Sequence, residues 1–169
     1  ALARLEASEG RRARAVVLHD AEDLVHPLEL RLFDSLIADH GAVQVPVQPI
    51  PDPASPWIAG HYCDEFAESH GKELVVRQAV GASIPLAGVG CAINREALAR
   101  LATAHGGKPF DAASMTEDYE MGLRLGAMGE RTLFVRLPEA SGRRAVIASR
   151  GQFPAGLGAA VRQKARWLG

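Results

Sequence analysis

Short apolar runs alternate with stretches of helical periodicity along most of the chain. Residues 15–18 form an apolar, β-branched run of the kind that is buried in a parallel sheet. Residues 43–50 alternate imperfectly and contain Pro46 and Pro49, which favours a strand near a sheet edge or one that ends early. A further strand is predicted at residues 132–137.

Residues 84–93 are also apolar, and Gly88 and Gly90 lie inside this run. Glycines within a strand indicate that a backbone segment or a ligand approaches closely at that point. The run therefore predicts a strand with such an approach near its middle.

Helical spacing of apolar residues fills the intervals between these runs. It predicts helices at residues 1–9, 27–41, 57–80, 95–104, from 116 onward, and 155–168. Gly71 is expected to interrupt the third of these, which would make it two helices. Strands that alternate with helices predict an α/β domain with a mostly parallel sheet flanked by helices.

Composition narrows the possible partners and compartments. A chain of 169 residues fits one domain, and its formal net charge of -1 gives no basic excess for binding nucleic acid. The two cysteines, Cys63 and Cys91, lack C-x-x-C spacing, which favours a reducing compartment. No apolar stretch approaches the ~18 residues that a membrane span needs.

An acidic loop follows the first predicted strand. Ligands of open α/β sheets bind beyond the carboxyl ends of the strands, and Asp20 and Glu22 lie at such an end. Their carboxylates are hard oxygen ligands suited to Mg²⁺ or Mn²⁺. Asp23 offers a second way to align the acidic motif. The alternative interpretation is a solvated loop that caps the helix beginning near Pro27.

Two more polar clusters follow along the chain. Thr116, Glu117 and Asp118 stand where a helix begins, and acidic residues in a first turn also serve as plain helix caps. Gln163, Arg166 and Trp167 share one face of the last predicted helix. A guanidinium can bind diphosphate oxygens and an indole can pack against a sugar ring. The alternative is an amphipathic helix with the tryptophan on the core and the arginine in solvent.

In this order the three clusters resemble the D-x-D, T-E-D and Q-x-x-R-W motifs of the membrane-associated family 2 glycosyltransferases, the group that includes cellulose synthase. Glu22 departs from the usual aspartate. The resemblance implies a GT-A fold in which residues 88–91 form the base of the acceptor site. It also implies the following roles: metal binding by Asp20 and Glu22 with Asp23 in support, general base for Asp118 with Glu117 in support, and binding of donor diphosphate and acceptor by Gln163, Arg166 and Trp167.

The expected function is inverting, Mg²⁺- or Mn²⁺-dependent transfer of a sugar from a nucleoside-diphosphate donor, expected to be UDP-linked, to a glycan or lipid-linked acceptor. The resemblance is nearest to bacterial inner-membrane transferases of polysaccharide synthesis, including those implicated in exopolysaccharide secretion or phage adsorption. It implies a location at the cytoplasmic face of that membrane. A non-catalytic binding module, suggested by Glu22, and a metal-dependent phosphohydrolase, which leaves Gln163 and Trp167 without a role, stay open as alternatives.

The chain starts without a methionine and stops just after the Arg-Trp pair. We therefore expect residues 1–169 to be the C-terminal portion of a single glycosyltransferase domain, carrying its metal, base and acceptor parts. Only a short helix precedes the acidic loop, so much of the uridine pocket and the membrane contact are expected outside this segment. The isolated segment is accordingly expected to be weakly active or inactive.

Overall fold

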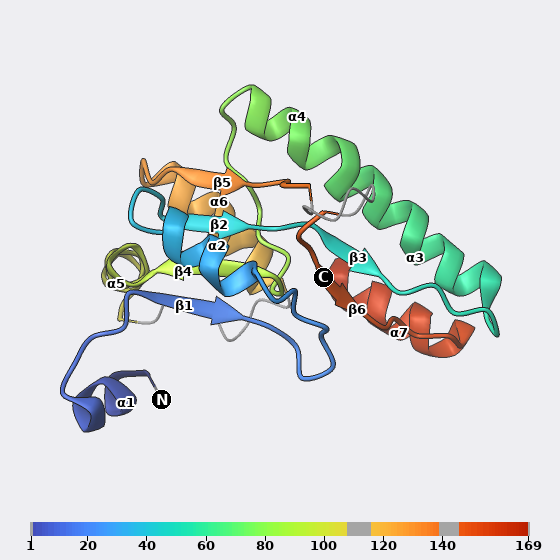
Figure 1. Cartoon of the computed structure of the whole chain (residues 1–169), viewed down its shortest axis with the longest axis horizontal. Coiled ribbons are helices and arrows are strands. Elements are labelled where there is room, and N and C mark those ends of the chain that lie inside the picture. Colours follow the sequence, from blue (N-terminus) through green and yellow to red (C-terminus); the bar gives the residue numbers. More distant parts are fainter. Residues whose placement is uncertain (1, 108–115, 139–145, 169) are drawn as a thin grey trace.

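The computed structural model describes residues 2–107, 116–138 and 146–168. Its strands are β1 (Ala15–Leu18), β2 (Ala42–Gln44), β3 (Val47–Pro49), β4 (Cys91–Asn94), β5 (Thr132–Phe134) and β6 (Ser149–Gly151). Four of them form a central sheet in the order β1-β4-β2-β5, and β3 pairs with β6 in a smaller sheet beside it (Figure 1).

Strand directions differ from the prediction of a mostly parallel sheet. β4 runs antiparallel to both β1 and β2, whereas β2–β5 and β3–β6 are parallel pairs. The predicted α/β class is confirmed, but the sheet is mixed. The predicted strand at 84–93 is also shorter than expected, because Gly88 and Gly90 have φ values of 74° and 59°, which an extended strand does not accommodate.

The helical segments are α1 (Leu2–Glu9), α2 (Glu29–Leu36), α3 (Pro56–Glu68), η1 (Ser69–Glu73), α4 (Leu74–Ala79), α5 (Arg95–Ala104), α6 (Glu117–Ala127) and α7 (Leu157–Leu168). The predicted interruption lies at Gly71, but it takes the form of one π-helical turn, η1, through which α3 continues into α4 (Figure 1). Local signals account for the starts of two helices. Pro56 stands in the first turn of α3, and Asn94 caps α5 by accepting hydrogen bonds from Glu96 N (2.9 Å) and Ala97 N (3.2 Å).

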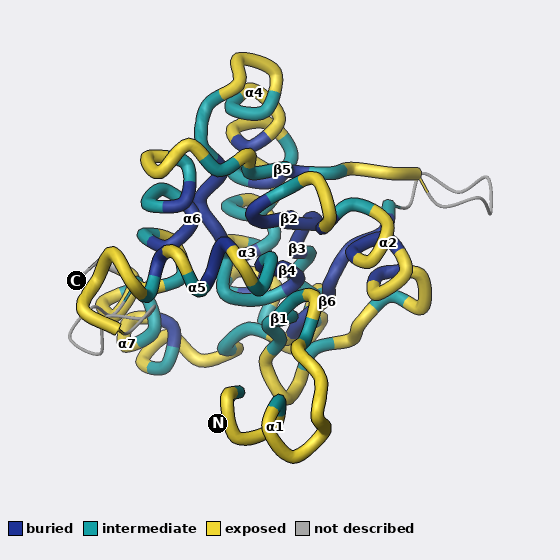
Figure 2. The backbone as a smooth tube through the Cα atoms, turned by 90° about the vertical axis from the view of Figure 1, so that its left-hand side faces the viewer, coloured by how far each residue is buried: buried dark blue, intermediate teal, exposed yellow. Residues whose placement is uncertain are grey.

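Helices cover both faces of the central sheet (Figure 2). Leu101 of α5 and Leu125 of α6 pack with Ile93 on one face. Phe33 of α2 packs with Ala92 on the other. Neighbouring residues of β4 thus point to opposite sides, as the period-two geometry of a strand requires, and each face carries its own apolar core.

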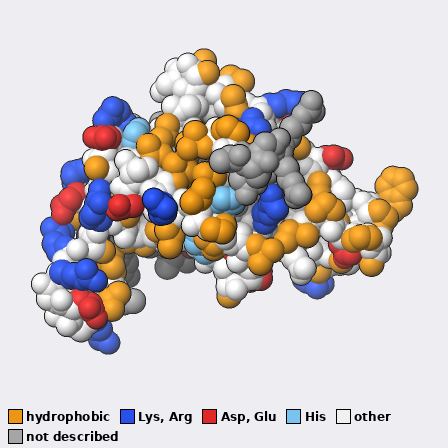
Figure 3. Space-filling view, viewed as in Figure 1, with side chains coloured by type: hydrophobic (Ala, Val, Ile, Leu, Met, Phe, Trp, Pro, Cys, Tyr) orange, Lys and Arg blue, Asp and Glu red, His pale blue; other side chains and the backbone are white. Residues whose placement is uncertain are grey.

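The N-terminal segment is held to the body by charge. Glu6 of α1 forms a salt bridge of 2.8 Å with Arg95 at the start of α5, and Arg12 pairs with Glu96 at 2.7 Å. On the face seen in Figure 3, basic and acidic side chains are interspersed around this end, with apolar side chains over the centre. Within the described segments, no helix combines the length and the apolar character needed to cross a bilayer.

Candidate active site

One cavity of about 740 Å³ brings the three sequence clusters together. Its walls come from the loop after β1, the segment before β4, the start of α6, the segment after β6, and α7. Residues of β3, α3, η1 and the start of α4 complete the lining. The predicted site residues that line it are Asp20, Glu22, Asp23, Asp118, Gln163, Arg166 and Trp167. Glu117 is not part of the lining, although it directly precedes Asp118.

The acidic loop presents two carboxylates to solvent and folds one back. Asp20 and Glu22 are exposed, whereas only 6% of the Asp23 side chain is exposed. Asp23 Oδ2 accepts a hydrogen bond of 2.9 Å from the Asp20 backbone N–H and lies 3.3 Å from His19 Nδ1. Although Asp20 is exposed as a whole residue, partial desolvation of its carboxyl group raises its pKa above the ordinary value, and the charges of Asp23 and Glu22 raise that pKa further. This mutual repulsion is what a divalent cation would relieve.

His19 supports this loop from behind. Its Nε2 lies 2.9 Å from Oε1 of the fully buried Glu29, at an ion-pair distance but without the angle of a hydrogen bond. Burial raises the pKa of Glu29, and the neighbouring imidazole opposes that rise. His19 therefore lies between Asp23 and Glu29 and contributes to the shape of the loop.

No group of three or more His, Cys, Asp or Glu side chains in the described ranges is arranged to hold a metal ion by itself. Mg²⁺ commonly binds through one or two carboxylates together with substrate phosphates and water. Asp20 and Glu22 are the pair available for that mode, because Asp23 already accepts a backbone hydrogen bond.

Asp118, in the first turn of α6, packs against Gly88. Its Oδ1 accepts a hydrogen bond of 2.8 Å from Tyr119 N, and its Oδ2 packs so closely on Gly88 that a Cβ at that position would overlap it. Burial raises the pKa of Asp118, and the charges of Glu117 and Asp20 add to the effect. A carboxylate whose pKa lies nearer neutrality is a stronger base for a hydroxyl proton.

Gln44 in β2 holds the turn at residues 87–90, against which Asp118 packs. Our sequence analysis missed this residue. Its Oε1 accepts a hydrogen bond of 2.9 Å from Ala87 N, and its Nε2 donates to the carbonyl oxygens of Val89 (2.9 Å) and Gly90 (3.0 Å). The signal in the sequence is a lone amide between two valines in a run that becomes completely buried.

Aromatic side chains from separate elements support the Q-x-x-R-W helix. The Tyr62 hydroxyl of α3 donates a hydrogen bond of 2.7 Å to Gln163 Oε1. The Tyr62 ring stacks on Phe153 at 4.8 Å and meets Trp167 edge-on at 6.2 Å. Trp167 keeps 37% of its surface exposed while lining the cavity, so part of the residue is available to a ligand.

Comparison with known proteins identifies the family of this chain. Residues 15–169 match the family model "Glycosyl transferase family group 2". The chain belongs to this family. It is 38% identical over 182 aligned residues to Bacteriophage adsorption protein B of Escherichia coli strain K12, and to the same extent to Bacteriophage N4 adsorption protein B of E. coli O157:H7. Each alignment covers 99% of this chain but 24% of the relative, so the chain spans about a quarter of their length.

The family assignment confirms the prediction of a family 2 glycosyltransferase, whereas the roles of individual residues stay predictions. In this family member, Lys164 joins the Q-x-x-R-W helix to α3. Its ammonium pairs with Glu65 and lies 4.6 Å from the ring centre of Tyr62 and 4.7 Å from that of Trp167. These cation–π contacts fix the position of Trp167 relative to α3.

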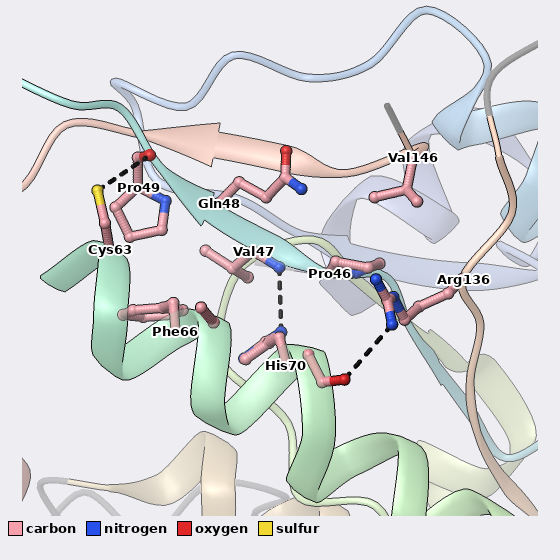
Figure 4. A pocket seen from close by; sticks show the side chains of 11 residues that line it. Pro46, Val47, Gln48, Pro49, Cys63, Phe66, His70, Arg136 and Val146 are labelled. Carbon is pink, nitrogen blue, oxygen red and sulfur yellow. Dashed lines mark hydrogen bonds between the residues drawn. The ribbon is translucent and has the colours of Figure 1, made fainter. Parts of the chain in front are cut away.

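A second cavity of about 280 Å³ lies between α3, η1 and β3 (Figure 4). It shares Val47, Phe66 and His70 with the larger cavity. His70 Nδ1 accepts a hydrogen bond of 3.0 Å from Val47 N, and burial lowers the pKa of His70 to about 4. None of the predicted site residues lines this second cavity.

Proposed function

We propose that this chain carries the catalytic centre of an inverting, metal-dependent glycosyltransferase. The reaction moves a sugar from a nucleoside-diphosphate donor, UDP-linked, to a hydroxyl of a glycan or lipid-linked acceptor. The observation that carries the proposal is that all three family motifs line one cavity, with a half-buried carboxylate of raised pKa at Asp118.

Asp20 and Glu22 would hold Mg²⁺ or Mn²⁺. Both are exposed in the cavity wall, and Asp20 shows the charge repulsion expected of neighbouring carboxylates. When bound, the cation would supply positive charge against the departing diphosphate. Asp23 supports the loop through its contacts to His19 and to the Asp20 backbone.

Asp118 is the proposed general base. It takes the proton of the acceptor hydroxyl as that oxygen bonds to the anomeric carbon, and the bond from that carbon to the diphosphate oxygen breaks with its electron pair. Attack on the face opposite the leaving group inverts the anomeric centre. Contact with Gly88 and the hydrogen bond from Tyr119 N hold the carboxylate in place for this step.

The Q-x-x-R-W helix is proposed to bind both substrates. Arg166 would offset charge on the departing diphosphate with its planar guanidinium. Trp167 offers an apolar surface for the acceptor ring. Gln163 is oriented by Tyr62, which occupies its Oε1 and leaves the amide nitrogen to donate to a sugar hydroxyl.

The names of the relatives connect them with bacteriophage adsorption. A polysaccharide at the cell surface can serve a phage as an attachment site, so synthesis of such a polymer is a function consistent with both the name and the cavity. We place this chain, as part of a longer protein, at the cytoplasmic face of the bacterial inner membrane, with membrane contact made by segments outside it.

The test is UDP release by the complete parent protein with a panel of nucleotide sugars and Mn²⁺ or Mg²⁺. The Asp118→Asn variant is measured beside Asp64→Asn, which makes the same change at an exposed position of α3 outside the cavity. We expect metal-dependent release with one donor, lost in the first variant and kept in the second. Metal-dependent UDP binding without release from any donor would instead favour the binding module, and phosphate release without sugar transfer the phosphohydrolase.

A further inference from the structure

We propose that Gln44 is a positioning residue, which sets the position of Asp118 by holding the turn at residues 87–90. This inference rests on the proposed function for the catalytic role of Asp118. The side-chain hydrogen bonds of Gln44 to described residues all go to Val45 and to residues 87–90, and none goes to the acidic loop or to α7.

Every polar atom of the Gln44 amide is used. Besides its bonds to Ala87, Val89 and Gly90, Nε2 donates to the carbonyl oxygen of Val45 at 2.8 Å. An amide nitrogen has two hydrogens for these three acceptors, so at least one hydrogen is shared. The residue is completely buried, and a buried amide that lost these partners would leave unpaired polar groups.

The turn has few other means of support. Gly88 and Gly90 both have positive φ and bring no side chain that could anchor the backbone. Ladder pairing of β4 begins only at Cys91, and the bond from Val45 N to Gly90 O (2.9 Å) precedes it by one residue. Gln44 therefore supplies the hydrogen bonds that a regular strand would have provided.

The turn at residues 87–90 also supports the proposed base, Asp118. Asp118 Oδ2 packs against Gly88, and the segment from Pro85 to Val89 lines the cavity. Release of the turn would move the surface on which the carboxylate rests. Asp20, Glu22 and Arg166 lie on other elements, so binding of metal and nucleotide should persist while turnover falls.

The test compares Gln44→Met with Gln48→Met in the complete parent protein. Methionine matches glutamine in length and removes all four hydrogen bonds. Gln48 lies on β3 outside the lining of the larger cavity and serves as the matched control. For Gln44→Met we expect kcat to fall about 10- to 100-fold, as small displacements of reacting groups do. The Mn²⁺-dependent affinity for UDP should stay within about twofold of wild type by the same reasoning.

A second variant, Gln44→Glu, gives a signature in the pH profile. Its carboxylate keeps an acceptor for Ala87 N but presents negative charge to three carbonyl oxygens unless it is protonated. Activity of this variant relative to wild type should therefore rise as the pH is lowered. A change that only weakened the fold would lower activity at every pH.

Hydrogen–deuterium exchange provides a readout that does not depend on turnover. We expect faster exchange in a peptide covering residues 85–90 of Gln44→Met, because Ala87 N loses its acceptor, and unchanged exchange in α5. Unchanged exchange at 85–90, wild-type kcat, or an equal loss of UDP affinity and kcat would each overturn the positioning role. A wild-type protein without turnover would refute the proposed function, while the exchange result would still decide whether Gln44 holds the turn.

Discussion

Replacing Gly88 by alanine tests the contact between the turn and the proposed base. The residue has φ of 74°, and a Cβ built there would overlap Asp118 Oδ2. The carboxylate would have to rotate away or the turn would have to move. Either response takes Oδ2 away from its present position against residue 88.

Two separate effects set the expected magnitude. A left-handed conformation costs a non-glycine residue roughly 1–2 kcal/mol, which lowers the melting temperature of a domain of this size by about 2–8 °C. Displacement of a reacting group by about 1 Å costs about 100-fold in rate. Gly88→Ala should show both effects.

The variant Gly81→Ala separates the effect of backbone strain from that of the displaced carboxylate. Gly81 follows α4 with φ of 69°, and a Cβ there meets no atom within 4 Å. This control carries the same backbone strain but touches nothing. We expect similar melting temperatures for the two variants in the parent protein, and turnover lost only in Gly88→Ala.

The assay is UDP release at saturating donor, with unfolding followed by circular dichroism on the same samples. Equal turnover in the two alanine variants would refute the reasoning, because it would show that the position of Asp118 does not depend on its contact with residue 88. Loss of turnover in both would show that strain alone disables the site.

Two further predictions concern neighbouring groups. Tyr62→Phe removes the hydrogen-bond donor to Gln163 Oε1, a net loss of about 1 kcal/mol. The variant should raise the KM for the acceptor more than it lowers kcat. An unchanged KM in acceptor titrations would count against a role for Gln163 in acceptor binding. The pKa of Asp118 is raised above its ordinary 3.8 by burial, so the folded state binds the proton more tightly and stability contributed by this group falls as pH rises past 3.8. Asp118→Asn should therefore melt at a higher temperature than wild type at pH 7 and lose turnover. The wild-type kcat should fall as the pH is lowered through the raised pKa of Asp118. A lower melting temperature for the variant would contradict the predicted direction of the stability change.

Local signals in the sequence predicted the positions of the helices, because the groups that satisfy these signals are neighbours along the chain. The single strand predicted at residues 43–50 is instead divided between β2 and β3, which belong to different sheets. The start of α5 depends on the Asn94 side chain and two backbone N–H groups within three residues. The glycines at 88 and 90 were predicted to admit a backbone segment or a ligand, whereas the groups that approach them in the structure are the side chains of Asp118 and Ser149. The positive φ values of these glycines, however, are incompatible with the strand predicted at residues 84–93.

Features that depend on distant partners could not be predicted from the residues alone. β6 is three residues long and exists through its pairing with β3, about a hundred positions earlier in the chain. Gln44 looks like any polar residue of a half-exposed strand until the sheet closes over it. The inward turn of Asp23 likewise depends on His19 and on the loop that surrounds both.

Strand direction had the largest consequence for the site. Leu18 pairs with Cys91, so the carboxyl end of β1 lies beside the amino end of β4. The acidic loop that leaves β1 and the turn that enters β4 therefore meet at one edge of the sheet (Figure 1). A parallel β4 of the same four residues would have placed its preceding turn about 13 Å away, at the opposite edge. The antiparallel pairing that the sequence pattern did not predict is thus what brings the proposed metal ligands and the support of the proposed base into one cavity.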